Sequence, residues 1–248
     1  MSHSPLTITD LYAARSRDFR LHIAALELQA GTITCIVGPN GSGKTTLIEC
    51  IVGLLRPQKG TVLLDGQAID NNLKRLKNIL GYIPDDEAWF VKELCAQEYF
   101  ELLTKIYQDA GVTANMQSNV HSLMTQLNFT QQTTALEQLS HGNKKKVQII
   151  AGLMHEPKLI VIDELRNGLD PLAIMTAERI IKQRAKAGAC IVAATHDLWW
   201  AQRLASNIMV ISNGDVKLAA TTKTIIKKYG SLEALFIELT KNTRDDSL

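Results

Sequence analysis

The chain has 248 residues, of which 46% are hydrophobic and 21% are charged, so it is long and apolar enough for a globular fold with a full-sized core. Its formal net charge of +2 is too small for a strong field, so we expect neither nucleic acid nor an anionic membrane as an obligate partner. The cysteines form no CxxC pair or Cys/His cluster, which argues against a metal site and a disulfide framework, and we expect them to be buried and reduced: Cys35, Cys50, Cys95 and Cys190.

The sequence offers no segment for crossing or passing through a membrane. No apolar run approaches the roughly 20 residues that a spanning helix needs, and residues 1–9 lack the basic start and apolar centre of a secretory signal. We therefore expect a cytoplasmic protein. If it serves a membrane process, the spanning part should be another polypeptide.

The N-terminal part mixes hairpins with one strand–loop–helix unit. Apolar residues within 6–11 predict an edge strand, and the β-branched run 32–37 predicts a buried strand. After a glycine-rich turn, the apolar run 45–52 predicts a helix. Residues 61–66 predict a strand that ends in an Asp-Gly hairpin turn.

The pattern then becomes helical, with apolar residues at roughly helical spacing over 91–129. Strands and helices alternate after that, which predicts parallel pairing: a strand at 159–162, a helix at 171–186 and a strand at 190–194.

The C-terminal part reads as one more hairpin followed by helices. The sequence predicts a strand at 208–211, a turn at 213–215 and a second strand at 216–218. Helices are predicted at 222–228 and 232–239, and we expect the tail 244–247 to be disordered.

One segment has the pattern GxxxxGK[ST] and lies between a predicted buried strand and a predicted helix, as a phosphate-binding loop must. Glycines let successive NH groups and the positive helix end face an anion. We expect Lys44 to reach the β and γ phosphates of ATP and the Thr45 hydroxyl to coordinate Mg²⁺. The predicted nucleotide-binding residues are Gly38, Pro39, Asn40, Gly41, Ser42, Gly43, Lys44, Thr45 and Thr46.

Two adjacent carboxylates end the predicted strand 159–162, which is the Walker-B pattern. The carboxyl edge of a parallel sheet would bring them beside the phosphate loop. Asp163 is predicted to bind Mg²⁺, directly or through water. Glu164 is predicted to orient or deprotonate the water that attacks the γ-phosphate.

Residues 139–143 resemble the signature of the ABC ATPase family, which usually reads LSGGQ. Ser140 also fits as the N-cap of a helix over 144–154. The resemblance implies that this segment contacts the ATP bound to an opposite subunit. It comprises Leu139, Ser140, His141, Gly142 and Asn143, of which the histidine and the asparagine depart from the family pattern.

Further segments resemble the family in the same order along the chain. The segment Asn167, Gly168, Leu169, Asp170 resembles the D-loop, and Pro171 can start the next helix. The resemblance makes His196 the switch histidine that senses the γ-phosphate, and residues 232–240 resemble the C-terminal helix of the exporter-type branch.

The resemblance implies one ABC ATPase domain with an α/β P-loop NTPase fold. Its mostly parallel sheet would be flanked by helices, with an N-terminal antiparallel β subdomain and an inserted helical subdomain. The core would comprise 1–84 and 158–220, the helical subdomain with the signature 85–157, and the C-terminal helices and tail 221–248.

The sequence departs from the family at several positions of interest. Asp85 stands where the Q-loop glutamine is usual, so a carboxylate that only accepts hydrogen bonds replaces an amide. We expect it to act as a weakened catalytic and metal-binding counterpart. The dipeptide 165–166 replaces the usual Pro-Thr, and the adenine-stacking residue is left open among Tyr12, Arg15 and Phe19.

Two local clusters have ordinary interpretations. Lys144, Lys145 and Lys146 are predicted to form a solvated helix face rather than a nucleic-acid site. Trp199 and Trp200 are predicted to serve packing or a partner contact.

The resemblance implies an ATP-binding and ATP-hydrolysing transporter subunit with ATP and Mg²⁺ as cofactors. It would pair with a second ATP-binding subunit, as a homodimer or with a close paralogue, and drive an integral membrane permease at the cytoplasmic face of the membrane. Two alternatives remain: a soluble ABC ATPase without a permease, and a regulatory subunit that binds ATP but hydrolyses it weakly.

Overall fold

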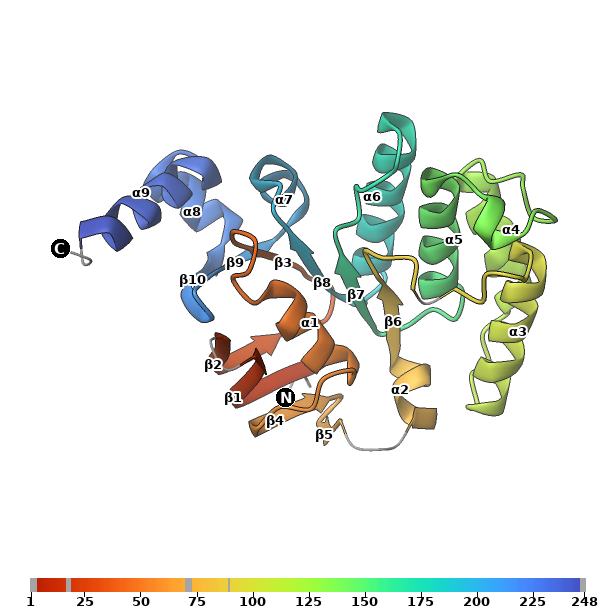
Figure 1. Cartoon of the computed structure of the whole chain (residues 1–248), viewed down its shortest axis with the longest axis horizontal. Helices are drawn as coiled ribbons and strands as arrows, with labels where there is room; N and C mark the ends of the chain where they lie inside the picture. Colours follow the sequence, from red (N-terminus) through yellow and green to blue (C-terminus); the bar gives the residue numbers. More distant parts are fainter. Residues whose placement is uncertain (1–3, 17–18, 70–72, 89, 246–248) are drawn as a thin grey trace.

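The computed structural model describes residues 4–16, 19–69, 73–88 and 90–245 (Figure 1). Its strands form one ten-stranded sheet in the order β5-β4-β1-β2-β10-β9-β3-β8-β7-β6. Helices cover both faces, so the chain has the predicted α/β class. Within the described residues, every helix is either too short or too polar to cross a membrane.

One half of the sheet is antiparallel and is built from the N-terminal residues. β1 (Leu6–Ser16) pairs with β2 (Phe19–Leu28) on one side and β4 (Lys59–Leu64) on the other, and β4 continues into β5 (Gln67–Ala68). The turn between β4 and β5 has positive φ at both central residues, as the Asp-Gly pair predicted. The predicted edge position of β1 is wrong, because β4 returns to cover its outer side.

The other half is mainly parallel. β3 (Ile33–Val37), β8 (Cys190–Thr195), β7 (Leu159–Asp163) and β6 (Leu80–Ile83) run parallel to one another, and β9 (Asn207–Ser212) is parallel to β3. β10 (Asp215–Thr221) turns back antiparallel to β9 and joins the two halves through its parallel contact with β2. Parallel pairing brings the carboxyl ends of β3, β7 and β8 to one edge.

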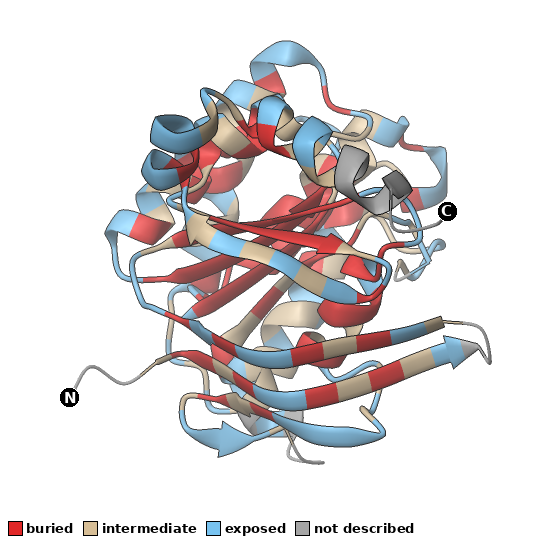
Figure 2. Ribbon diagram, turned by 90° about the vertical axis from the view of Figure 1, so that its left-hand side faces the viewer, coloured by how far each residue is buried: buried red, intermediate tan, exposed pale blue. Residues whose placement is uncertain are grey.

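The burial pattern matches this division (Figure 2). β3, β7 and β8 are buried at every residue, whereas β2 combines buried with exposed positions. Alternate residues of β3 enter opposite cores: Cys35 and Val37 pack on one face, and Ile36 packs on the other. The cysteines are free, and all but the half-buried Cys95 are buried.

The helices flank this sheet. In Figure 1, α3 (Ala96–Asp109), α4 (Met116–Gln126) and α5 (His141–Leu153) group beyond the β6 edge, and α8 (Thr222–Tyr229) and α9 (Leu232–Asp245) lie at the opposite end. The remaining helices are α1 (Lys44–Val52), α2 (Leu73–Ile79), α6 (Pro171–Lys186) and α7 (Leu198–Leu204), with a short 3₁₀ turn at Leu136–Gln138. The division into core, helical subdomain and C-terminal segment stays a prediction.

The tail prediction is partly wrong. Arg244 and Asp245 continue helix α9, while Asp246 and Ser247 lie outside the described residues. The two tryptophans of α7 differ: Trp200 is fully buried, and its indole Nε1 donates to Glu178 Oε1 at 3.0 Å, whereas Trp199 is 56% exposed. Packing therefore accounts for only one of them.

Candidate active site

The glycine-rich loop connects the carboxyl end of β3 to α1. Gly41 and Gly43 have φ of 77° and 110°, a region that other residues adopt only with strain. Gly38 has no room for a side chain, since a Cβ would lie 2.1 Å from the Ile211 carbonyl oxygen. The loop is therefore shaped by glycine at each of these positions.

Lys44 is the first residue of α1 and is only 7% exposed. Its Nζ donates to the carbonyl oxygens of Gly38 and Pro39 at 2.9 and 3.1 Å. Burial lowers the pKa of Lys44 below its ordinary value, while Glu164 and Asp163 oppose that shift. The ammonium therefore lies inside the curl of the loop, facing the carboxylates of the sheet edge.

A cavity of about 480 Å³ opens in front of this loop. The motif contributes Asn40, Gly41, Gly43, Lys44, Thr45 and Thr46 to its lining. The other lining residues are the carboxylates of Asp85, Asp163 and Glu164, with Arg15 and Phe19 on the β1–β2 side. Basic, hydroxyl and acidic groups that are distant in the chain thus converge on one cavity.

Asp163 ends β7 and is 5% exposed. Burial, followed by repulsion from Asp85 and Glu164, raises the pKa of Asp163 to about 6, and a hydrogen bond with the Thr45 side chain and the charge of Lys145 oppose that rise. Oxygen ligands of this kind suit Mg²⁺. Among the described residues, no group of three or more His, Cys, Asp or Glu is arranged to hold a metal ion.

Glu164 has φ of 46° and lies where β7 and β8 end. Its Oε1 accepts hydrogen bonds from the backbone N of His196 at 3.0 Å and pairs with the imidazole Nδ1 at 2.7 Å. Its Oε2 accepts from the Thr195 hydroxyl at 3.0 Å. The carboxylate and the predicted switch histidine are therefore held together.

Asp85 connects the cavity to the predicted D-loop. Its Oδ1 accepts from the Asn167 side-chain amide at 2.7 Å. Asp170 caps α6, with its Oδ1 accepting from Ala173 N at 2.9 Å. The segment at Asp85 and the predicted D-loop are thus hydrogen-bonded to each other.

The predicted signature segment lies apart from this cavity, since none of residues 139–143 lines it. Ser140 is exposed and caps α5, with its hydroxyl accepting from Asn143 N at 3.3 Å. His141 Nδ1 lies 3.0 Å from Glu87 Oε1, and the Asn143 amide donates to Gln131 Oε1 at 2.7 Å. The imidazole of His141 also packs over Gly168, where a Cβ would lie 2.1 Å from Cδ2 of the ring.

Comparison with known proteins assigns the family. The family model described as ABC transporter matches residues 21–167. The ABC-type transporter ATP-binding protein EcsA of Bacillus subtilis is 30% identical over 243 residues, covering 96% of this chain and 97% of that protein. The chain belongs to the ABC transporter family.

Solved structures agree with this assignment. A structure titled as the ATP binding subunit of an ABC transporter has a TM-score of 0.87 at 27% identity, covering 96% of this chain and 100% of that one. The dimeric structure of the bacterial ABC transporter cassette MJ0796 has a TM-score of 0.77 at 22% identity, covering 88% and 98%, and supports the fold. The ABC ATPase assignment and the P-loop NTPase fold are confirmed, while the exporter-type branch stays a prediction.

The prediction of a solvated lysine face is wrong for Lys145 of this ABC ATPase. Lys145 is 1% exposed, and burial lowers its pKa to about 8 against the opposing charges of Asp85, Asp163 and Glu164. Lys144 Nζ donates to Glu87 Oε2 at 2.8 Å. The bond from His141, then that from Lys144, holds the pKa of Glu87 below its ordinary value.

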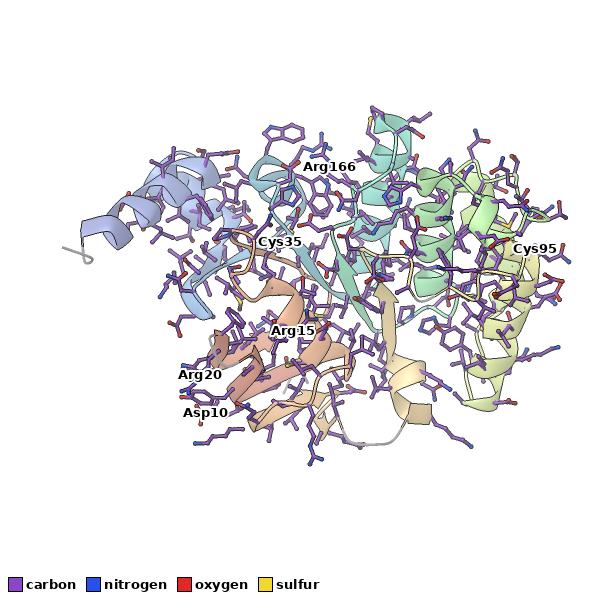
Figure 3. All side chains as sticks on the ribbon, viewed as in Figure 1. Asp10, Arg15, Arg20, Cys35, Cys95 and Arg166 are labelled. Atoms are coloured by element: carbon purple, nitrogen blue, oxygen red, sulfur yellow. The ribbon has the colours of Figure 1, made fainter. Side chains whose placement is uncertain are left out.

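The structure reduces the number of candidates for the adenine-stacking residue. Tyr12 stacks on His22 with ring centroids 4.2 Å apart and does not line the cavity. Arg15, which Figure 3 labels beside α1, lines the cavity together with Phe19 and pairs with Glu49. The two candidates at the cavity are therefore Arg15 and Phe19.

Leu165 and Arg166, which replace the usual Pro-Thr, have a specific place in the structure. The Arg166 guanidinium bonds Asp197, the N-cap of α7, and Figure 3 shows Arg166 near the upper ends of α6 and α7. This bond joins the segment after Glu164 to the segment after His196, and sequence reasoning did not anticipate it.

Proposed function

We propose that this ABC ATPase is a transporter subunit that pairs with a second ATP-binding subunit around two ATP molecules and drives a separate integral membrane permease. The proposal rests first on the convergence of Lys44, Asp85, Asp163 and Glu164 on one cavity of about 480 Å³. A cationic loop opposite a set of carboxylates suits a triphosphate with its divalent ion.

Pairing is supported by the location of the signature. Ser140 is exposed at the start of α5 and lies outside the cavity of its own chain. A helix N-terminus with a free face is suited to phosphate, and a two-fold arrangement would let each chain present it to the other's nucleotide. Such pairing would make the distance between subunits depend on ATP, and a permease can follow that change.

The phosphate loop, Glu164 and His196 each have a defined task in this proposal. The loop amides and Lys44 bind the β and γ phosphates, while Glu164 orients the attacking water or accepts its proton. The bonds from Thr195 and His196 fix the carboxylate of Glu164. Through these bonds His196 is well placed to respond to the γ-phosphate.

The residues fit Mg²⁺ as the accompanying ion. The hydroxyl of Thr45 bonds Asp163, and Asp85 borders the same cavity, so three oxygen donors can face one cation. The bound ion would neutralise charge on the transferring phosphoryl group.

The direct experiment compares wild type with Lys44→Ala and Glu164→Gln. Lys44→Ala should lose ATP binding and turnover, because it removes the buried cation. Glu164→Gln should keep ATP binding and lose about a hundredfold or more in kcat, because an amide cannot accept the proton. Chromatography of Glu164→Gln with ATP should show a dimer that the nucleotide-free protein does not form. Unchanged turnover of Glu164→Gln would remove that residue from the mechanism.

The permease and the location at the cytoplasmic membrane face need a separate test. We expect the protein to co-purify from membranes with a multi-helix polypeptide, and its recovery free of any such partner would favour the soluble alternative. Asp85 beside the phosphate site is the observation that favours a weakly hydrolysing regulatory subunit. Turnover measured with and without partner membranes separates that role from a motor.

A further inference from the structure

Lys145 is more deeply buried than either of its lysine neighbours. It lies in the second turn of α5, is 1% exposed, and is among the largest fully buried side chains of the described chain. Lys144 and Lys146 are only half-buried. A buried ammonium is expensive unless it is hydrogen-bonded and balanced by charge, so its presence calls for a specific role.

The ammonium of Lys145 joins two segments that border the cavity. Its Nζ donates to the Pro84 carbonyl oxygen at 2.7 Å and to the Asp163 carbonyl oxygen at 3.4 Å. Pro84 directly precedes Asp85, and Asp163 directly precedes Glu164. One side chain from α5 thus links the segments that follow the paired ends of β6 and β7.

The charge of Lys145 faces the same carboxylates that face the cavity. Asp85 acts on it most strongly, followed by Asp163 and Glu164. These three side chains line the cavity together with the phosphate loop. Negative charges at such short separations repel one another. The Lys145 ammonium, which lies outside the cavity, offsets that repulsion.

We propose that Lys145 is a positioning residue for ATP hydrolysis: bonded to the Pro84 and Asp163 carbonyls, it holds Asp85, Asp163 and Glu164 at their working separation and balances their charge. This inference rests on the proposed function, because it takes those carboxylates as the metal-binding and water-orienting groups. Lys145 lines no part of the cavity, so it acts through these residues and does not touch the nucleotide.

The main test replaces Lys145 by methionine, which keeps much of the volume and removes the charge and the donors. We expect kcat to fall about tenfold to a hundredfold, the range that small displacements of reacting groups produce. KM and the calorimetric affinity for ATP should stay within about threefold of wild type, because Lys145 bonds Pro84 and Asp163 and not the phosphate loop. Calorimetric stoichiometry also shows whether the loss comes from inactive protein.

Lys146→Met is the matched control, since it removes the adjacent lysine from the same helix and should leave kcat within about twofold of wild type. Lys145→Gln is the second variant should the methionine protein fail to fold, and it should recover part of the kcat because its amide can still donate to a carbonyl. A thermal melt of each variant reports the fold separately from turnover.

Charge balance has its own readout. Lys145→Met should lower the melting temperature, and adding Asp85→Asn to it should restore part of that loss, because the uncompensated carboxylate is then gone. Additive effects of the two changes on the melting temperature would contradict the charge-balancing role.

Either of two results would overturn the positioning role: a folded Lys145 variant with kcat within about threefold of wild type, or a kcat loss matched by an equal loss of ATP-binding stoichiometry. Failure of the wild type to bind or hydrolyse ATP would instead count against the proposed function.

Discussion

The contact between His141 and Gly168 predicts a coupled effect on stability. Gly168 has φ of 79°, and a Cβ there would lie 2.1 Å from Cδ2 of His141. Gly168→Ala should therefore cost about 1 kcal/mol for the left-handed backbone. It should cost about 1 kcal/mol more because the imidazole must move and lose its 3.0 Å contact with Glu87.

The backbone cost and the cost of displacing His141 can be measured separately. In a His141→Gly background the ring is absent, so Gly168→Ala should cost only the backbone part, about 1 kcal/mol. Gly188→Ala is a control for that part, because Gly188 has φ of 104° and a Cβ there would meet no described atom within 4 Å. Urea unfolding followed by circular dichroism measures all of the variants. Equal costs of Gly168→Ala with and without His141 would refute the argument.

Two further predictions concern Ser140 and His155. Ser140→Ala should cost about 1 kcal/mol of stability by removing the cap of α5. Ser140→Asp should keep the cap, yet lower ATPase activity if the segment faces phosphate, because a carboxylate repels it; full activity in Ser140→Asp would exclude that contact. Burial lowers the pKa of His155 from 6.5 to about 4, so the unfolded chain takes up a proton that the folded chain refuses, and stability should fall as the pH drops from 6.5 towards 4. Urea unfolding of His155→Phe at several pH values should show a shallower fall by up to about 1.4 kcal/mol per pH unit, and an unchanged slope would contradict this assignment.

Local patterns predicted much of the fold. The bounds of α6, from Pro171 to Lys186, agree with the predicted ones, and Pro171 was the signal for its start. Buried strands such as β7 and β8 were visible as short aliphatic runs. The position of β1 inside the sheet was not visible, because strand order depends on pairing with the distant β4.

Two short helices, α2 and α7, were not predicted from the sequence. Helix α2 spans only seven residues, so its apolar residues Leu73, Leu76 and Ile79 form a periodic run of less than two full turns. Helix α7 begins after Asp197, whose carboxylate accepts from Trp200 N at 2.8 Å, and this capping residue was the available signal.

The lysine cluster shows the same limit within the candidate site. Consecutive residues of a helix point about 100° apart, so three of them cannot share one solvated face. The next residues of α5 are buried, from Val147 to Leu153, which means the helix is enclosed on most sides. That pattern was a signal that one lysine must turn inward, but its acceptors, Pro84 and Asp163, are distant in the chain.

Residues 84–87, which follow β6, are hydrogen-bonded to several residues of α5. Gln148 donates to the Asp86 carbonyl oxygen at 2.5 Å, and the other links join Lys145 to Pro84 and both His141 and Lys144 to Glu87. Closely packed elements that are joined by several hydrogen bonds deform little relative to one another. We therefore expect a displacement of α5 to move Asp85 with it.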